Sequence, residues 1–398
     1  MSESTSSVRA RFGDRSLFPL LGARSYLNHA AVGPPSSRVC AAVRAQQDAF
    51  ASQGAAAWMP GMAQRERVKV KLAQLLSVDP KDLALMPSTT RAISDLARCF
   101  PWRPGDRILG FEGEFLTNVT PWRVAAEGFG ASLVLLPLGG FRGPSVEAGL
   151  AELERELRRG VRLVAVSAVQ FSDGLAMPLA AMARLCHQYG AELAVDAMQA
   201  VGNLPLNLTE LGVDYAAGGS HKWMFGPDGA GFLYVRPDRL AGLVQRVAGW
   251  LSHEGPPGFL FPDGGPVRYD VPLRRSIDWL EVGAAHGLAF AGWEAGIDMV
   301  AELGVPQIRA YTQEYHDRIE GAFVELGAQS LRSPDPTGRS AILSFRLKQP
   351  LTPVFRSLNE SGVAVSTPAG LLRLSPHWPN SFDEIPEVVA ALARAIEA

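Results

Sequence analysis

The sequence lacks the features that mark disulfide-rich, zinc-binding and membrane proteins. Its 3 cysteines, Cys40, Cys99 and Cys186, are widely spaced and form no CxxC pair, which excludes a disulfide framework and a zinc site. No apolar run is long enough to span a bilayer, so no membrane association is expected. Residues 1–16 are polar and contain no apolar signal segment. These absences predict a cytoplasmic protein.

The sequence also lacks a strong net charge. With 38 Lys and Arg against 40 Asp and Glu, the formal charge is -2, and no dense basic cluster is present. Nucleic acid is therefore not an expected partner. The apolar fraction of 47% is typical of a globular chain, and 398 residues suit two domains at about 150 residues each.

Between residues 80 and 236, short aliphatic runs alternate with amphipathic stretches. This pattern predicts strands joined by crossover helices in a mainly parallel sheet, which is an α/β fold. Helices are expected at 91–98 and 178–189. The expected strands are 107–111, 132–136, 162–166, 192–195 and 231–235.

The C-terminal third of the chain predicts a smaller α+β domain. Gly and Pro dominate residues 256–272, which indicates a long surface loop, and a long helical pattern follows. Strands are expected at 340–347, 363–365 and 371–374, and a closing helix at 383–397. The predicted division is an N-terminal segment 1–25, a large domain 26–270 and a small domain 271–398.

The strongest chemical signal is Lys222, which follows Gly218-Gly219-Ser220-His221. A lysine among small, flexible residues is suited to forming a Schiff base, and the adjacent Ser and His are suited to holding a phosphate. The alternative is a surface lysine in a glycine-rich turn.

Asp196 lies at the end of an apolar strand and is followed by Gln199. Pyridoxal 5′-phosphate (PLP) withdraws electrons best while its pyridine nitrogen is protonated, and a buried carboxylate stabilises that proton. Gln199 is near enough in sequence to donate to the phenolic oxygen of the same ring. The alternative for Asp196 is a capping role in the turn that follows.

Thr89 and Thr90 open a predicted helix after Ser88. The N–H groups and the dipole at a helix start attract phosphate, and the threonine hydroxyls add donors. Ordinary N-capping explains the same residues.

Together these segments resemble the class V aminotransferase family of fold-type I PLP-dependent enzymes, which includes cysteine desulfurases and isopenicillin N epimerase. The resemblance runs from the segment that begins at Tyr26 to the segment around Arg373. It implies a PLP cofactor, an amino-acid substrate, a homodimer, and a large domain with a mainly parallel sheet beside a smaller C-terminal domain. No metal is implied.

The resemblance also assigns roles to individual residues. It makes Lys222 the covalent attachment point and catalytic residue, and Arg373 the ligand of the substrate carboxylate, for which a planar guanidinium is well suited. A surface salt bridge is the alternative for Arg373. Asn28 and His29 are expected near the substrate, with a structural role for His29 left open. The cofactor-binding residues are expected to be Thr89, Thr90, Phe115, Asp196, Gln199, Ser220, His221 and Lys222.

The chain departs from the desulfurase pattern in four places. Phe115 stands where desulfurases have a stacked, proton-transferring His, and Phe171 stands where they have an Asn. Residues 364–372 contain no cysteine to receive sulfur. Ala284 and Ala285 stand near the position where relatives place a Thr on the phosphate of the neighbouring subunit.

These departures favour a PLP-dependent lyase, with C–S cleavage as one form, because an apolar ring shields a carbanion but transfers no proton. Transamination and epimerisation remain open alternatives. A non-catalytic PLP-fold binding protein is the competing class. The presence of Lys222, Asp196 and Arg373 together argues against it.

Overall fold

The computed structural model describes residues 8–255, 258–260, 264–283 and 286–397. A seven-stranded sheet lies at its centre, in the order β2-β8-β7-β6-β5-β3-β4. Strand β8 is antiparallel to both neighbours and the other pairs are parallel. The strands are β2 (Leu83–Met86), β3 (Arg107–Phe111), β4 (Ser132–Leu136), β5 (Leu163–Ser167), β6 (Glu192–Asp196), β7 (Tyr215–Gly219) and β8 (Gly231–Val235).

The predicted α/β fold is confirmed, and all five strands expected in this region are present within one residue of their predicted bounds. Strands β2 and β7 were not predicted. Their sequences, LALM and YAAGG, contain almost none of the β-branched residues that signal a strand, and burial in the sheet overrides that weak propensity.

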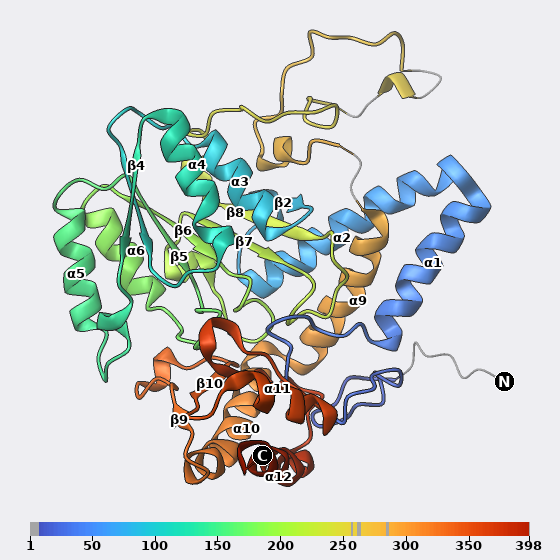
Figure 1. Cartoon of the computed structure of the whole chain (residues 1–398). Helices are drawn as coiled ribbons and strands as arrows, with labels where there is room; N and C mark the ends of the chain where they lie inside the picture. The colour runs from blue at the N-terminus through green and yellow to red at the C-terminus, as the bar shows by residue number, and fades with distance from the viewer. Residues whose placement is uncertain (1–7, 256–257, 261–263, 284–285, 398) are drawn as a thin grey trace.

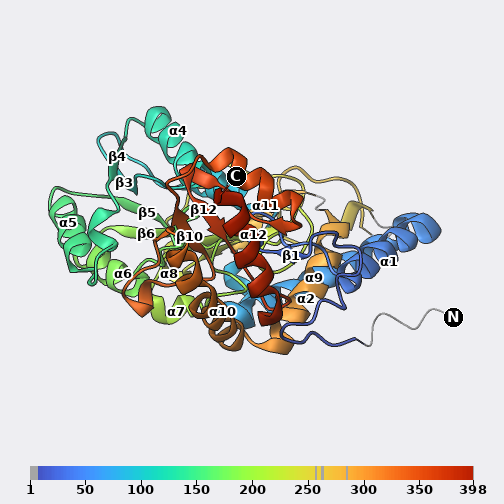
Figure 2. The same cartoon turned by 60° about the horizontal axis from the view of Figure 1, so that its bottom comes forward.

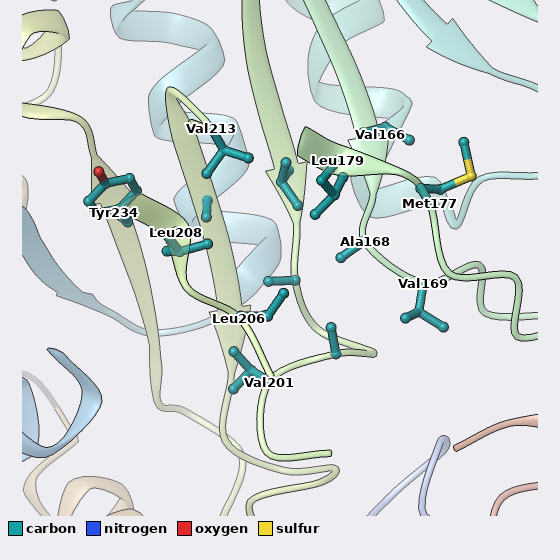
Figure 3. Packing of buried hydrophobic residues seen from close by; sticks show 14 of the residues in the cluster. Val166, Ala168, Val169, Met177, Leu179, Val201, Leu206, Leu208, Val213 and Tyr234 are labelled. Carbon is teal, nitrogen blue, oxygen red and sulfur yellow. The ribbon is translucent and has the colours of Figure 1, made fainter. Parts of the chain in front are cut away.

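Helices cover both faces of the sheet (Figure 1). Side chains alternate along each strand, so Leu109, Val164 and Val166 belong to the core shared with α2, α5, α6 and α9. Figure 3 shows part of this core, where Val166, Leu179 and Val213 converge. Ile108 and Ala165 instead contact the core shared with α3 and α4. The helices up to α9 are α1 (Ser37–Gln53), α2 (Trp58–Leu76), α3 (Thr89–Cys99), α4 (Thr120–Phe129), α5 (Glu147–Leu157), α6 (Leu179–Gln188), α7 (Leu208–Leu211), α8 (Pro237–Leu240) and α9 (Gly287–Leu303).

The C-terminal elements form a second cluster with its own apolar core, next to one end of the sheet (Figures 1 and 2). A three-stranded antiparallel sheet, β12-β10-β9, packs there with three helices. A short parallel pair, β1 with β11, ties the N-terminal segment to this cluster. Its elements are β1 (Ser25–Tyr26), α10 (Val305–Glu325), β9 (Gln329–Ser330), β10 (Leu343–Arg346), α11 (Leu351–Glu360), β11 (Val363–Ala364), β12 (Leu372–Leu374) and α12 (Ile385–Glu397).

The division at residue 270 stays a prediction. Across the part of the chain that the structure describes, we find no helix with the length and apolar character needed to cross a bilayer.

Candidate active site

The chemical motifs of the sequence meet at the carboxyl ends of the parallel strands. Asp196 ends β6, Lys222 lies just after β7, and Phe115 lies just after β3. Thr89 begins α3, directly after β2, and Arg373 arrives from β12 of the C-terminal cluster. In open α/β sheets this edge is where ligands bind.

These side chains line a cavity of about 460 Å³. Its lining includes eight of the residues predicted from the sequence, namely Thr89, Thr90, Phe115, Asp196, Gln199, His221, Lys222 and Arg373. Ala30, Ala31, Ser88, Thr117, Ser167, Val169, Phe171, Met198 and Pro368 complete the lining. A mixed lining with a few convergent polar groups is typical of a cofactor or substrate site.

The loop that carries Lys222 is fixed by close backbone packing. Gly33 donates its N–H to the carbonyl of His221 at 2.8 Å, and a Cβ at Gly33 would lie 1.9 Å from the carbonyl oxygen of Lys222. Phe225 adopts a left-handed backbone with φ 54°, which costs free energy for a non-glycine residue. Gly33 and the strained turn fix the backbone of Lys222. This packing argues against the free surface turn that was the alternative for Lys222.

The amine of Lys222 makes no hydrogen bond or ion pair within the described residues, and it lies 5.8 Å from the centre of the Phe115 ring. Burial lowers the pKa of Lys222 to about 8, against the opposing attraction of Asp196. A neutral amine is the nucleophilic and basic form, so this environment favours reaction at the Nζ atom.

Asp196 keeps one carboxylate oxygen available to the cavity. Its Oδ1 accepts from the N–H of Met198 at 2.9 Å, and no hydrogen bond to Oδ2 occurs among the described residues. Burial raises the pKa of Asp196 to about 6. A cationic N–H placed beside it would offset the cost of burying this carboxylate.

Gln199 is held with one N–H left over. Its Nε2 donates to the carbonyl of Ala30 at 3.0 Å, and its Oε1 accepts from Nε1 of Trp223 at 2.9 Å. Because an amide nitrogen has two hydrogens, one donor remains for a ligand oxygen. This geometry agrees with the donor role predicted for Gln199.

The start of α3 offers donors to an anion. Ser88 caps the helix by accepting from the N–H of Arg91, and the first N–H groups of an α-helix have no intrahelical partners. Thr90 and Thr117 share a hydrogen bond of 2.8 Å between their hydroxyls. This helix start therefore has the N–H and hydroxyl donors that a phosphate requires.

The two other predicted phosphate ligands differ in their surroundings. His221 lines the cavity, and its Nδ1 lies 3.1 Å from Oδ1 of Asp228. Ser220 is fully buried, donates to the carbonyl of Pro227 and is not part of the lining. Its part in phosphate binding stays a prediction.

Arg373 is 4% exposed and forms no ion pair among the described residues. This finding argues against the surface salt bridge that was the alternative for Arg373. Its Nη1 donates to the carbonyl of Phe171 at 2.6 Å, and its Nε donates to Oγ of Ser366 at 3.0 Å. Burial lowers the pKa of Arg373 to about 10. The guanidinium keeps unused N–H groups that can donate hydrogen bonds to a carboxylate.

Phe115 and Phe171 form an edge-to-face pair, with ring centres 5.3 Å apart. Both rings line the cavity, and two of the four positions at which the chain departs from the desulfurase pattern therefore lie together in the site. The predicted Ala284 and Ala285 departure lies outside the described residues.

Asn28 and His29 do not line the cavity. His29 is 2% exposed, its Nδ1 lies 3.1 Å from the carbonyl of Ser375, and burial lowers its pKa well below the usual value. The backbones of Asn28 and Ser375 form an isolated parallel β-bridge. These contacts tie the N-terminal segment to β12, which favours the structural role that the sequence left open for His29.

Glu114 was not predicted from the sequence. It is 7% exposed and accepts hydrogen bonds from Ser167, Gln170 and Asn118 behind the cavity. The sequence signal that could have indicated Glu114 was a carboxylate shortly after the buried parallel strand β3.

The residues present fit PLP. A buried carboxylate oxygen without a partner suits a protonated ring nitrogen, a lysine with a lowered pKa suits its aldehyde, and the α3 start suits its phosphate. Phe115 presents an apolar ring to the same cavity.

Comparison with known proteins identifies the family of the chain. Residues 26–372 match the family model of the class V aminotransferases. A cysteine desulfurase from Dickeya dadantii is 29% identical over 76% of this chain and 71% of its own length. Isopenicillin N epimerase from Streptomyces clavuligerus is 28% identical over 82% of this chain and 83% of its own length.

Solved structures share the fold. The cystine C–S lyase C-DES, in complex with cysteine persulfide, superposes with a TM-score of 0.84 at 24% identity, over 94% of this chain and 99% of C-DES. Another C-DES structure, with glycine covalently linked to the PLP cofactor, has a TM-score of 0.85 at 24% identity, over 96% of this chain and 99% of C-DES. The family predicted from the sequence is confirmed: this chain belongs to the class V aminotransferases, a family of PLP-dependent enzymes.

Proposed function

We propose that this protein is a PLP-dependent lyase that eliminates a leaving group from the side chain of an amino acid, with C–S cleavage as the leading reaction. One observation carries the proposal. Lys222, Asp196 and Arg373 line one cavity, and none of the three makes an ion pair within the described residues. Buried charges left without partners in a cavity are typical of a catalytic site.

Each of the three has a separate task. Arg373 binds the substrate carboxylate, Asp196 holds a proton on the ring nitrogen, and the neutral amine of Lys222 removes the proton from Cα. When bound, PLP supplies the electron sink that stabilises negative charge at Cα. Departure of a thiolate from Cβ then breaks the C–S bond. Hydrolysis of the remaining unsaturated amino acid gives ammonia and a 2-oxo acid.

Elimination is favoured over epimerisation because of Phe115, and over sulfur transfer because a cysteine is missing from residues 364–372. A phenyl ring excludes water from its face but carries no titratable proton. Epimerisation needs a proton donor on that face, and His29, which the sequence placed near the substrate, is buried and does not line the cavity. Persulfide formation needs a mobile cysteine, and residues 364–372 contain none.

We propose further that the preferred substrate has an uncharged, apolar side chain. Among the described residues, no charged side chain lines the cavity apart from Arg373 and the groups assigned to the cofactor. The other lining residues are mostly apolar, with hydroxyls from Ser88, Thr117 and Ser167. A second cavity of about 570 Å³, lined mostly by apolar side chains and by Arg98, shares Thr90, Phe115 and Thr117 with the first.

Product analysis tests the lyase. With S-alkyl and S-benzyl cysteines we expect thiol, ammonia and 2-oxo acid in equal amounts, without conversion of PLP to its amine form. S-carboxymethyl cysteine serves as the charged control, and it should react at least about tenfold more slowly in kcat/KM. Stoichiometric amine form, reversed by added 2-oxo acid, would instead identify an aminotransferase. Exchange of the Cα proton with inversion would identify an epimerase.

A homodimer and a cytoplasmic location belong to the same proposal. The family resemblance supports the dimer, and the balanced charge and isolated cysteines support a reducing compartment. Light scattering on the purified full chain should give twice the monomer mass of 42.7 kDa. A monomer that retains full activity would contradict the dimer.

A further inference from the structure

Glu114 is a buried acid that the proposed mechanism does not use. It lies between β3 and the cavity, directly before Phe115, and it forms no ion pair with Lys, Arg or His among the described residues. Burying a carboxylate without a cation is costly unless hydrogen bonds replace its water.

Hydrogen-bond donors surround this carboxylate. Oε1 accepts from the N–H of Ser167 at 2.7 Å and from Nε2 of Gln170 at 2.9 Å. Oε2 accepts from the hydroxyl of Ser167 and from Nδ2 of Asn118 at 3.3 Å. Burial raises the pKa of Glu114, and these hydrogen bonds oppose that rise.

Two of the donors, the backbone N–H of Ser167 and the amide of Asn118, are fixed in orientation. Oδ1 of Asn118 accepts from Nε1 of Trp122 at 3.1 Å, so the amide of Asn118 is oriented with its nitrogen toward Glu114. A backbone N–H cannot accept, and Gln170 also presents nitrogen. Most of the surrounding groups therefore suit an ionised carboxylate and would leave a proton on Glu114 without an acceptor.

The same hydrogen bonds connect Glu114 to three parts of the cavity wall. Ser167 pairs with Asp196 across β5 and β6. Gln170 precedes Phe171, whose carbonyl positions Arg373. Phe115, the neighbour of Glu114 in sequence, is 49% exposed, and its carbonyl accepts from the N–H of Asn118 at 2.8 Å.

We propose that Glu114 is a positioning residue, whose ionised carboxylate fixes the loop of Phe115 against the end of β5, where Ser167 pairs with Asp196. This inference rests on the proposed function, because Phe115 is the ring that would contact PLP. Glu114 touches neither cofactor nor substrate and acts through Phe115.

The test is a double-mutant cycle read out as the dissociation constant for PLP. Glu114→Gln keeps the size of the side chain but directs an amide NH2 toward groups that are themselves donors. Loss of one charged hydrogen bond corresponds to roughly 10- to 100-fold weaker binding. We expect that loss in the full chain titrated with PLP, and a much smaller effect of Glu114→Gln, about threefold or less, when Phe115 is already Ala.

Glu112→Gln is the matched control, because Glu112 is exposed two residues earlier in the same loop. It should leave the dissociation constant within about twofold, as expected for a surface substitution. Should Glu114→Gln fail to fold, Asn118→Ala removes one donor to Glu114, together with the acceptor of Trp122, from outside the cavity lining and should show the same coupling to Phe115.

Two results would overturn the inference while leaving the proposed function intact: unchanged PLP affinity in Glu114→Gln, or an equal loss with and without Phe115. Failure of the wild-type chain to bind PLP at all would contradict the proposed function, and the inference with it.

Discussion

Charged groups have ion-pair partners at one end of the central sheet and lack them at the other end, among the described residues. At the amino ends of the strands, Asp214 is completely buried and bonded to His187, Arg236 and Arg239, and to the N–H of Leu193. At the carboxyl ends, Asp196 and Arg373 are also buried and Lys222 is half-buried, but none of the three has a charged partner in contact among the described residues. The first arrangement holds the fold together, and the second keeps its charges available for a ligand.

The largest expected effect comes from a substitution at the amino ends of the strands, where the buried charges form ion pairs. Asp214→Ala leaves two arginines without their shared carboxylate, and loss of one partner from a buried ion pair costs about 3–5 kcal/mol of unfolding free energy. Urea unfolding measures this loss. Asp238→Ala is the control at the same end, because Asp238 is largely exposed and its pair with Arg236 should contribute about 1 kcal/mol or less. Equal losses in both variants would contradict the comparison.

Asp196→Asn is the corresponding change at the unpaired end. We expect kcat to fall about 10²–10³-fold, the usual cost of removing one preorganised electrostatic partner from a reacting group. PLP should be partly retained, and the fold should be no less stable. Steady-state kinetics and cofactor content check both points. Near-normal turnover would remove Asp196 from its assigned role.

The pH dependence of stability sharpens the same comparison. In the cofactor-free chain, burial raises the pKa of Asp196 to about 6 from 3.8, so the folded state binds the extra proton between these values. Stability therefore falls as pH rises from about 4 to about 6. At about 1.36 kcal/mol per pKa unit, the fall is at most about 3 kcal/mol. The difference between wild type and Asp196→Asn isolates this contribution, and a difference that does not vary with pH would contradict it.

A smaller effect concerns the rate at which Lys222 captures PLP. Only the neutral amine reacts, and burial lowers the pKa of Lys222 to about 8. We expect the rate to rise about fivefold from pH 7 to 8 and less than twofold from pH 8 to 9, whereas a lysine with the ordinary pKa of about 10.4 would keep gaining. Stopped-flow absorbance distinguishes the two profiles.

The sequence predicted the parts of the site that depend on short-range pattern. Asp196 and Gln199 follow an aliphatic strand, and Lys222 lies in a distinctive glycine-rich segment, so strand ends and motif coincide. Strand β7 was missed because its small residues carry little β signal, although it positions Lys222.

Other parts depend on contacts between distant segments. Ser220 donates to the carbonyl of Pro227, and His29 contacts Ser375, 346 residues away in the chain. Glu114 gains its surroundings from Ser167 and Gln170, on a different strand end. No local pattern encodes such partners, which is why these roles became visible only in the folded chain.

The central claim is that Lys222 is the residue that carries PLP. Borohydride reduction of the purified protein, followed by peptide mapping, tests it directly. The account predicts a stable pyridoxyl label on the peptide containing Lys222, and loss of both the label and the visible absorbance band in Lys222→Ala. A label on another lysine, or a visible band that survives in Lys222→Ala, would contradict it.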